Sequence, residues 1–142
     1  MVVLIGILAG FAALAFGDGG RSRLLVSNAE LVRALGEVGL QEAVLTGRPL
    51  GLAATRDQYA LVEYRGGSWR PRLGDALFRL RNLPPGMRFE LTGLAATNRA
   101  PVAVFLPDGL ADLTPLAVVD ETSGRAARLQ PEARRYRVEE TR

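Results

Sequence analysis

The acidic side chains in the C-terminal half are the residues whose type could hold a metal ion. Carboxylate oxygens are preferred ligands of Ca²⁺, and four acids lie close together in sequence at Asp108, Asp112, Asp120 and Glu121. Their spacing does not match the D-x-D-x-D-G pattern of a calcium loop. We therefore expect these acids to lie in turns and at strand edges, and we predict no metal site and no cofactor.

Catalytic chemistry is restricted by two residue types that are absent. The 142 residues include no histidine and no cysteine, so neither a Ser/His nor a Cys/His nucleophile–base pair can form. Histidine is also the commonest metal ligand and a frequent general base. We predict no catalytic residue and a protein that is not an enzyme. A periplasmic enzyme with an N-terminal anchor is a distant alternative.

The positive charges could contact a polyanion, because all 18 basic residues are arginine. They are densest near the C-terminus, where Arg134, Arg135 and Arg137 could bind DNA phosphates. Acidic neighbours in the same stretch and a net charge of only +3 favour an ordinary solvated hairpin instead. We therefore do not expect nucleic acid as a partner, and DNA contact by these three arginines is the alternative.

An uncharged apolar run at residues 1–16 opens the chain. As a helix it would be about 24 Å long, whereas the hydrocarbon core of a bilayer is about 30 Å thick. Its 16 residues are just fewer than the roughly 17–25 apolar residues that usually cross a bilayer. No helical wheel of this run has a polar face, so lipid or other chains must cover it. We predict a membrane or filament-core helix, and a cleaved signal peptide or the distal part of a longer helix are alternatives. The predicted contact residues are Val2, Leu4, Ile5, Gly6, Leu8, Gly10, Phe11, Leu14 and Phe16.

A second, amphipathic helix is predicted at residues 22–46, after a glycine-rich break at 17–20. Its large apolar residues recur at intervals of 3, 4 and 7, which is the helical period. We expect Leu31, Leu35 and Val38 to be buried against the rest of the domain. A glycine and a proline just after residue 46 predict the end of the helix there.

The rest of the chain has the short periodicity and turn signals of β-strands. The predicted extended segments are 50–55, 58–65, 68–73, 76–80, 87–92, 102–106, 113–119, 126–130 and 135–140. A long helix followed by short strands predicts an α+β fold in which the helix lies across an antiparallel sheet.

The order of these segments resembles that of a type IV pilin-like protein. Residues 42–52, EAVLTGRPLGL, resemble the helix exit of the H-type minor pseudopilins of type II secretion (GspH family) and their minor type IV pilin relatives. YALVE and GGSW between residues 59 and 69 resemble the first hairpin of that family. LPPG at 83–86 and FLPDG at 105–109 resemble its L-P-x-G and F-x-P-x-G turns. The resemblance covers nearly the whole chain.

The resemblance implies a pilin-like fold with two parts. Residues 1–16 would form the transmembrane or filament-core helix, and residues 17–142 a periplasmic domain whose β-part spans about 50–140. The implied function is that of a structural component of the periplasmic pseudopilus, which supports protein export across the outer membrane. The implied location is the bacterial inner membrane, crossed once, with the globular domain in the periplasm.

The resemblance also implies partners. These are other pseudopilins, the inner-membrane assembly platform, and the membrane itself through the N-terminal helix. A minor type IV pilin, acting in pilus assembly or DNA uptake through the basic C-terminal hairpin, is the alternative.

Family members begin with a basic leader, a cleavage site and a glutamate, and Met1 starts after all of these. This departure implies a late start codon, a truncated sequence or a protein defective in processing.

Overall fold

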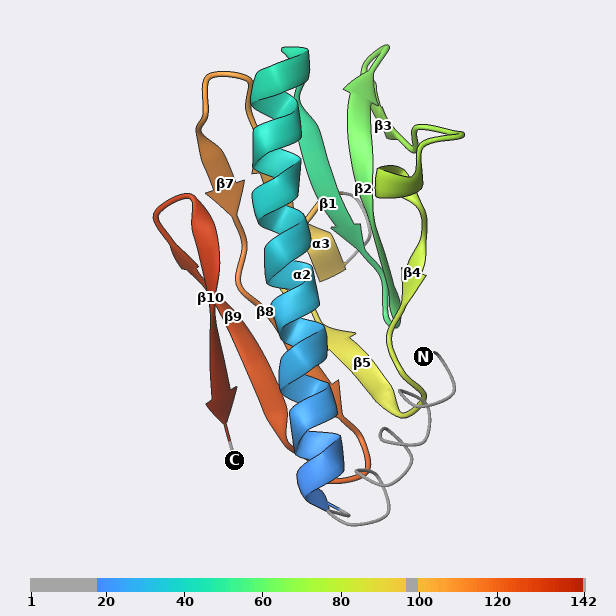
Figure 1. The fold of residues 1–142 in the computed structure, drawn as a ribbon, viewed down its shortest axis with the longest axis vertical. Helices are drawn as coiled ribbons and strands as arrows, with labels where there is room; N and C mark the ends of the chain where they lie inside the picture. Colours follow the sequence, from blue (N-terminus) through green and yellow to red (C-terminus); the bar gives the residue numbers. More distant parts are fainter. Residues whose placement is uncertain (1–17, 97–99, 142) are drawn as a thin grey trace, which may run out of the picture.

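The long helix α2 (Asp18–Thr46) lies across the strands along the length of the domain (Figure 1). The computed structural model describes residues 18–96 and 100–141, so the predictions for residues 1–16 lie outside the described part. The predicted break is wrong for residues 18–20, which are helical. The first described turn is attached to the strands, because Arg21 donates to Asp120 at 2.9 Å and Ser22 to Glu140 at 2.6 Å. These contacts offset the low helix propensity of glycine.

The end of α2 agrees with the sequence. Gly47 follows the last helical residue with a φ of +69°, and its N–H donates to the carbonyl of Ala43 at 3.0 Å. This left-handed glycine is a common way to satisfy the last carbonyls of a helix.

The strands form two antiparallel sheets. One sheet has the order β3-β2-β1-β6-β7, with β4 also paired to β2, and the other has the order β10-β9-β8-β5. The bounds are β1 (Leu50–Ala54), β2 (Gln58–Arg65), β3 (Ser68–Arg70), η1 (Ala76–Phe78), β4 (Arg81–Asn82), β5 (Met87–Glu90), α3 (Gly93–Ala96), β6 (Ala103–Phe105), β7 (Ala111–Leu113), β8 (Leu116–Asp120), β9 (Ala126–Glu132) and β10 (Arg135–Thr141).

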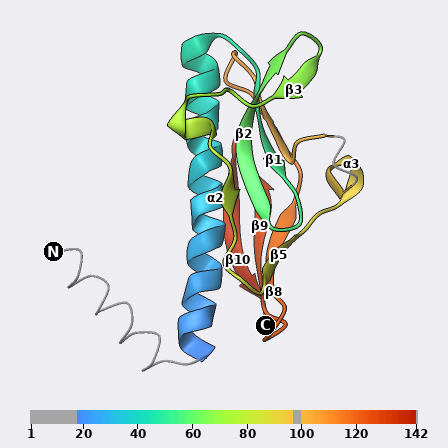
Figure 2. The same cartoon turned by 90° about the vertical axis from the view of Figure 1, so that its right-hand side faces the viewer.

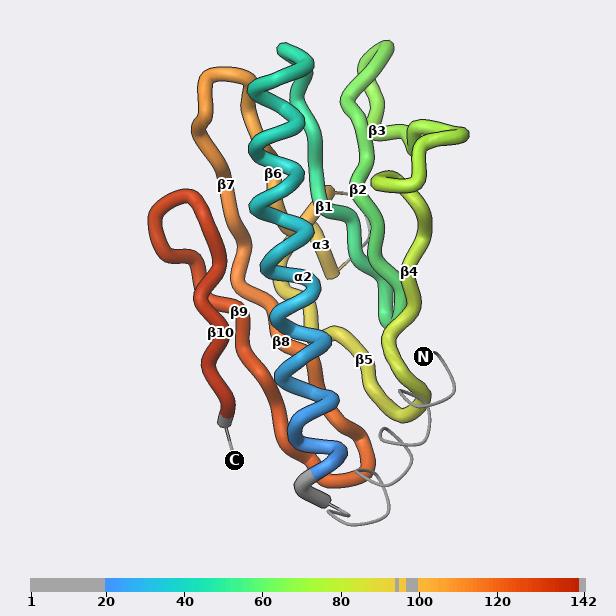
Figure 3. Tube along the Cα trace, in the orientation of Figure 1, coloured from blue at the N-terminus to red at the C-terminus, as the bar shows by residue number. Residues whose placement is uncertain are grey.

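The helix and the strands make two layers. Figure 2 shows α2 on one side and the strands of both sheets on the other, and the trace in Figure 3 follows α2 across both sheets. The α+β fold predicted from the sequence, with a helix laid on antiparallel strands, is confirmed.

Two predicted extended segments differ from the structure. Residues 76–80 contain the 3₁₀ turn η1 instead of a strand, because the Asp75 carboxylate accepts the N–H of Leu77 at 3.0 Å. Residues 113–119 are divided between β7 and β8, which belong to different sheets. Pro115 lies between these strands, and a proline cannot donate a hydrogen bond to a sheet ladder.

The face of α2 that packs on the strands also differs from the prediction. Leu35 is buried, with 7% of its surface exposed, whereas Leu31 and Val38 are exposed at 58% and 40%. The prediction that Leu31 and Val38 are buried is therefore wrong. The buried apolar residues of α2 are Leu25, Ala29, Val32, Leu35 and Ala43. One position along a helix turns the side chain by about 100°, so this face lies beside the one predicted.

Candidate functional surfaces

Three of the four acidic residues that the sequence singles out lie in separate contacts. Asp120 pairs with Arg21 at 2.9 Å, and Glu121 pairs with Arg56 at 3.2 Å. Asp108 accepts the N–H of a residue in its own turn at 3.0 Å. Within residues 18–96 and 100–141, no group of three or more histidine, cysteine, aspartate or glutamate side chains could hold a metal ion.

Asp120 attaches the start of α2 to the turn between β8 and β9. Its side chain is 1% exposed, and besides Arg21 it accepts bonds from the Thr122 N–H at 3.0 Å and the Ser123 hydroxyl at 3.2 Å. The hydrogen bonds from Arg21 lower the pKa of this carboxyl to about 2, with smaller contributions from Thr122 and Ser123, while burial acts in the opposite direction. The arrangement is a structural anchor in which one carboxylate accepts hydrogen bonds from three residues.

Glu63 is the centre of a second buried charge cluster, at the other end of α2. Its carboxylate accepts from Arg48 at 2.8 Å and from Arg72 at 3.1 Å. These hydrogen bonds, first that of Arg48, lower its pKa. Arg72 also approaches Glu42 of α2 at 3.6 Å and Asp75 at 3.4 Å. The cluster therefore connects β2, the helix end and the segment before η1.

The C-terminal arginines lie on the exposed hairpin of β9 and β10, where the sequence predicts them. Arg135 approaches Glu37 of α2 at 3.9 Å. Arg137 contacts two carboxylates of its own hairpin, one of them at 3.8 Å. Positive charge at Arg135 and Arg137 is therefore balanced locally, which weakens the attraction of this surface for phosphates.

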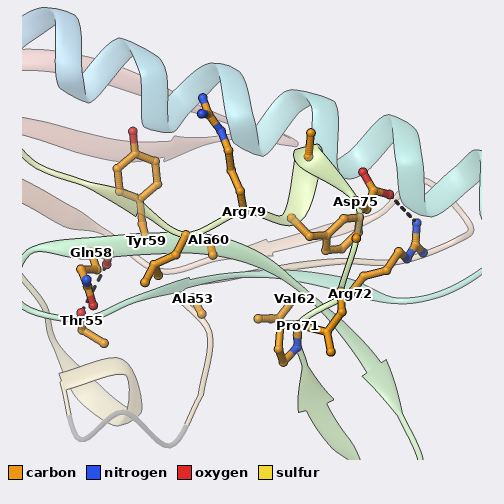
Figure 4. A pocket seen from close by; sticks show the side chains of 15 residues that line it. Ala53, Thr55, Gln58, Tyr59, Ala60, Val62, Pro71, Arg72, Asp75 and Arg79 are labelled. Carbon is orange, nitrogen blue, oxygen red and sulfur yellow. Dashed lines mark hydrogen bonds and ion pairs between the residues drawn. The ribbon is translucent and has the colours of Figure 1, made fainter.

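The surface that the sequence analysis missed is a hollow of about 680 Å³ between α2 and β4. Leu31 and Val38 border it on the helix, and Arg79 and Arg81 line it on the other side. A second hollow of about 760 Å³ adjoins it and shares Arg79 with it. Figure 4 shows the Arg79 side chain directed toward α2. The only sequence signal for this surface was the regular spacing of large apolar residues along the helix, which we interpreted as a buried face.

The predicted N-terminal contact residues, from Val2 to Phe16, lie outside the described residues. Within residues 18–96 and 100–141, no helix combines the length and the apolar character needed to cross a bilayer.

Comparison with known proteins relates the chain to one component of bacterial protein secretion. No protein-family model matches it. The type II secretion system protein H of Pseudomonas aeruginosa is 36% identical over 97 residues, which are 66% of this chain and 54% of that protein. The chain thus spans about half the length of this relative.

Two solved structures with the same fold are those of the minor pseudopilin EpsH and of GspH. The minor pseudopilin EpsH from the type 2 secretion system of Vibrio cholerae superposes with a TM-score of 0.60 at 17% identity, over 81% of this chain and 94% of that one. The solution structure of E. coli GspH gives a TM-score of 0.61 at 17% identity, over 86% and 93%. The resemblance predicted from the sequence is confirmed: the chain is a homologue of type II secretion system protein H and has the fold of the H-type minor pseudopilins.

Proposed function

We propose that the chain is a minor pseudopilin of a type II secretion system, a structural component of the periplasmic pseudopilus that supports protein export across the outer membrane. The observation that carries this proposal is the 36% identity to type II secretion system protein H over 97 residues. The arrangement of α2 on two antiparallel sheets supports it, because it is the fold of the H-type structures.

The proposal assigns a place to each part of the chain. Residues 1–16 would cross the bacterial inner membrane once and pack in the filament core, and residues 17–142 would form the periplasmic domain. The partners would be other pseudopilins and the inner-membrane assembly platform. A structural role without catalysis agrees with a composition that has no histidine and no cysteine.

Secretion in the bacterium that encodes the chain tests this proposal. Deleting the gene should leave in the periplasm a set of proteins that the parent strain exports, measured by mass spectrometry of periplasm and culture medium. The intact gene supplied in trans should restore export, and a gene that lacks the codons for residues 1–16 should not. An exported set that is unchanged by the deletion would contradict the proposal.

DNA binding tests the alternative of a DNA-uptake pilin. We expect weak binding that hardly changes when Arg134, Arg135 and Arg137 are replaced by alanine, because two of these arginines already contact carboxylates. Binding should be titrated at two salt concentrations, since contacts to phosphates weaken steeply with salt. Tight binding near physiological salt that the triple substitution abolishes would favour the alternative.

A further inference from the structure

Four large apolar residues form an exposed stripe along α2. Leu24, Leu31, Val38 and Leu45 are exposed at 39%, 58%, 40% and 81%, and they recur every seven residues. That spacing places them on nearly the same side of the helix, over a length of about 32 Å. Large apolar residues exposed along one side of a helix commonly mark an interaction site.

The middle of the stripe borders the hollow between α2 and β4, which we call the helix–loop groove. Leu35 and Tyr59 are its buried apolar residues, 7% and 4% exposed. Leu31, Val38 and Leu80 are its exposed apolar residues, and Leu80 is 59% exposed. Its lining also includes Asn28, Asn82 and two arginines, so apolar and polar side chains share the surface of this groove.

The charge in this groove is positive and uncompensated. Its lining includes Arg79 and Arg81 and, among the described residues, no aspartate or glutamate. In the described part of the chain, Arg81 donates to two backbone carbonyls, those of Leu77 at 3.1 Å and Arg79 at 3.0 Å. Burial and the neighbouring Arg79 lower the pKa of Arg81. Within residues 18–96 and 100–141, neither arginine forms an ion pair with a carboxylate, so both can receive one from outside the chain.

We propose that the helix–loop groove binds an acidic amphipathic helix of a partner protein. Apolar residues of that helix would pack along the stripe, because a seven-residue repeat matches the facing surface of a second helix. Its carboxylates would contact Arg79 and Arg81, which supply the charge complementarity. The inference rests on the surface itself and not on the proposed function, so each can fail separately.

The absence of cysteine allows a single reporter to be placed in the groove. We would attach an environment-sensitive dye to an Ala34→Cys variant of the full chain in neutral lipid nanodiscs, because Ala34 lines the groove and its replacement keeps the leucines. The titrant is a synthetic helix with leucine in a heptad pattern and flanking glutamates. A peptide with arginines in place of the glutamates and an acidic peptide interrupted by prolines are the controls, together with empty nanodiscs.

We expect saturable binding of the acidic helix alone. Arg79→Glu should weaken it at least tenfold and should gain binding of the arginine peptide, a rescue that a merely damaged fold would not give. Leu31→Ala should weaken binding, whereas Leu110→Ala, which removes an equally exposed leucine (58%) elsewhere, should not. Arg65→Glu, at an exposed arginine of the β2–β3 hairpin, is the matched charge control.

Several results would overturn the proposal. Equal binding of the acidic and basic peptides would remove the role of the arginines, and equal binding of the proline-interrupted peptide would indicate an extended occupant. A dye response to unlabelled chain alone would indicate a second copy as the occupant. No saturable response to the acidic helix would show that the groove has no such ligand.

Discussion

Two glycines on the buried face of α2 test how closely the helix approaches the sheet. A Cβ atom added to Gly39 would lie 2.8 Å from Cε2 of Phe105 and 3.0 Å from Cδ2 of Leu61. A Cβ added to Gly36 would lie 3.6 Å from Cζ of Phe105, which is an ordinary contact. Phe105 and Leu61 are 1% and 0% exposed, so neither can move aside into solvent.

The expected change in stability has two parts, a gain in helix propensity at both positions and a cost of overpacking at one of them. Replacing glycine by alanine inside a helix gains about 1 kcal/mol of helix propensity at either position. Only Gly39→Ala adds an overpacking cost, typically about 1–3 kcal/mol. We therefore expect Gly36→Ala to be neutral or stabilising by up to about 1 kcal/mol, and Gly39→Ala to be less stable than Gly36→Ala by about 1–3 kcal/mol.

Urea unfolding of the full chain, followed by circular dichroism, measures both free energies. Introducing Phe105→Leu into the Gly39→Ala variant should recover part of the loss, since the two residues would be coupled by contact. If Gly39→Ala proved as stable as Gly36→Ala, the close approach of α2 to β6 would be refuted.

Three further measurements test other contacts of the fold. The pKa of Asp120 is lowered from 3.8 to about 2, so its ionised form contributes at most about 2.5 kcal/mol to stability. This contribution should be complete above about pH 5 and be lost as the pH falls through about 2, and the unfolding free energy of Asp120→Asn should lack that loss. Leu35→Ala should lower the unfolding free energy by about 2–5 kcal/mol, whereas Leu31→Ala should change it by no more than about 0.5 kcal/mol. Equal melting temperatures of these two variants would mean that the buried face of α2 is assigned wrongly. Tyr136→Phe removes a buried hydroxyl that lies 2.7 Å from the Thr114 carbonyl and should cost about 1–3 kcal/mol; an unchanged denaturation midpoint would contradict this.

Elements specified by local sequence were predicted well. The strand predicted at 58–65 has the same bounds as β2 (Gln58–Arg65), because alternating residues and the Gly66-Gly67 turn are both local signals. The helix end at Gly47 depends likewise on one glycine. Pro115 is a local sign that residues 113–119 are divided, but the sheet that each half joins depends on long-range contacts. One of these is the bond from the Tyr136 hydroxyl to the Thr114 carbonyl.

The candidate surfaces were less predictable than the fold, because their properties depend on residues far apart in sequence. The C-terminal arginines are identifiable in the sequence, but the contact of Arg135 with Glu37 of α2 is not. The positive groove requires Arg79 and Arg81 to lie beside a helix more than thirty positions earlier, which only the folded chain shows.

The face of α2 was misjudged for a reason that bears on the groove. The periodicity of a sequence shows only where large apolar residues lie on the helix. Burial, however, depends on how the side chains of the helix and of the sheet together fill the space between the two layers. The buried face contains small residues such as Ala29, Gly36 and Gly39, and the sheet fills the remaining space with Phe105 and Leu61. The large residues at seven-residue spacing are therefore not needed for the contact with the sheet. An apolar stripe that the domain does not bury is explained most directly by a partner that does.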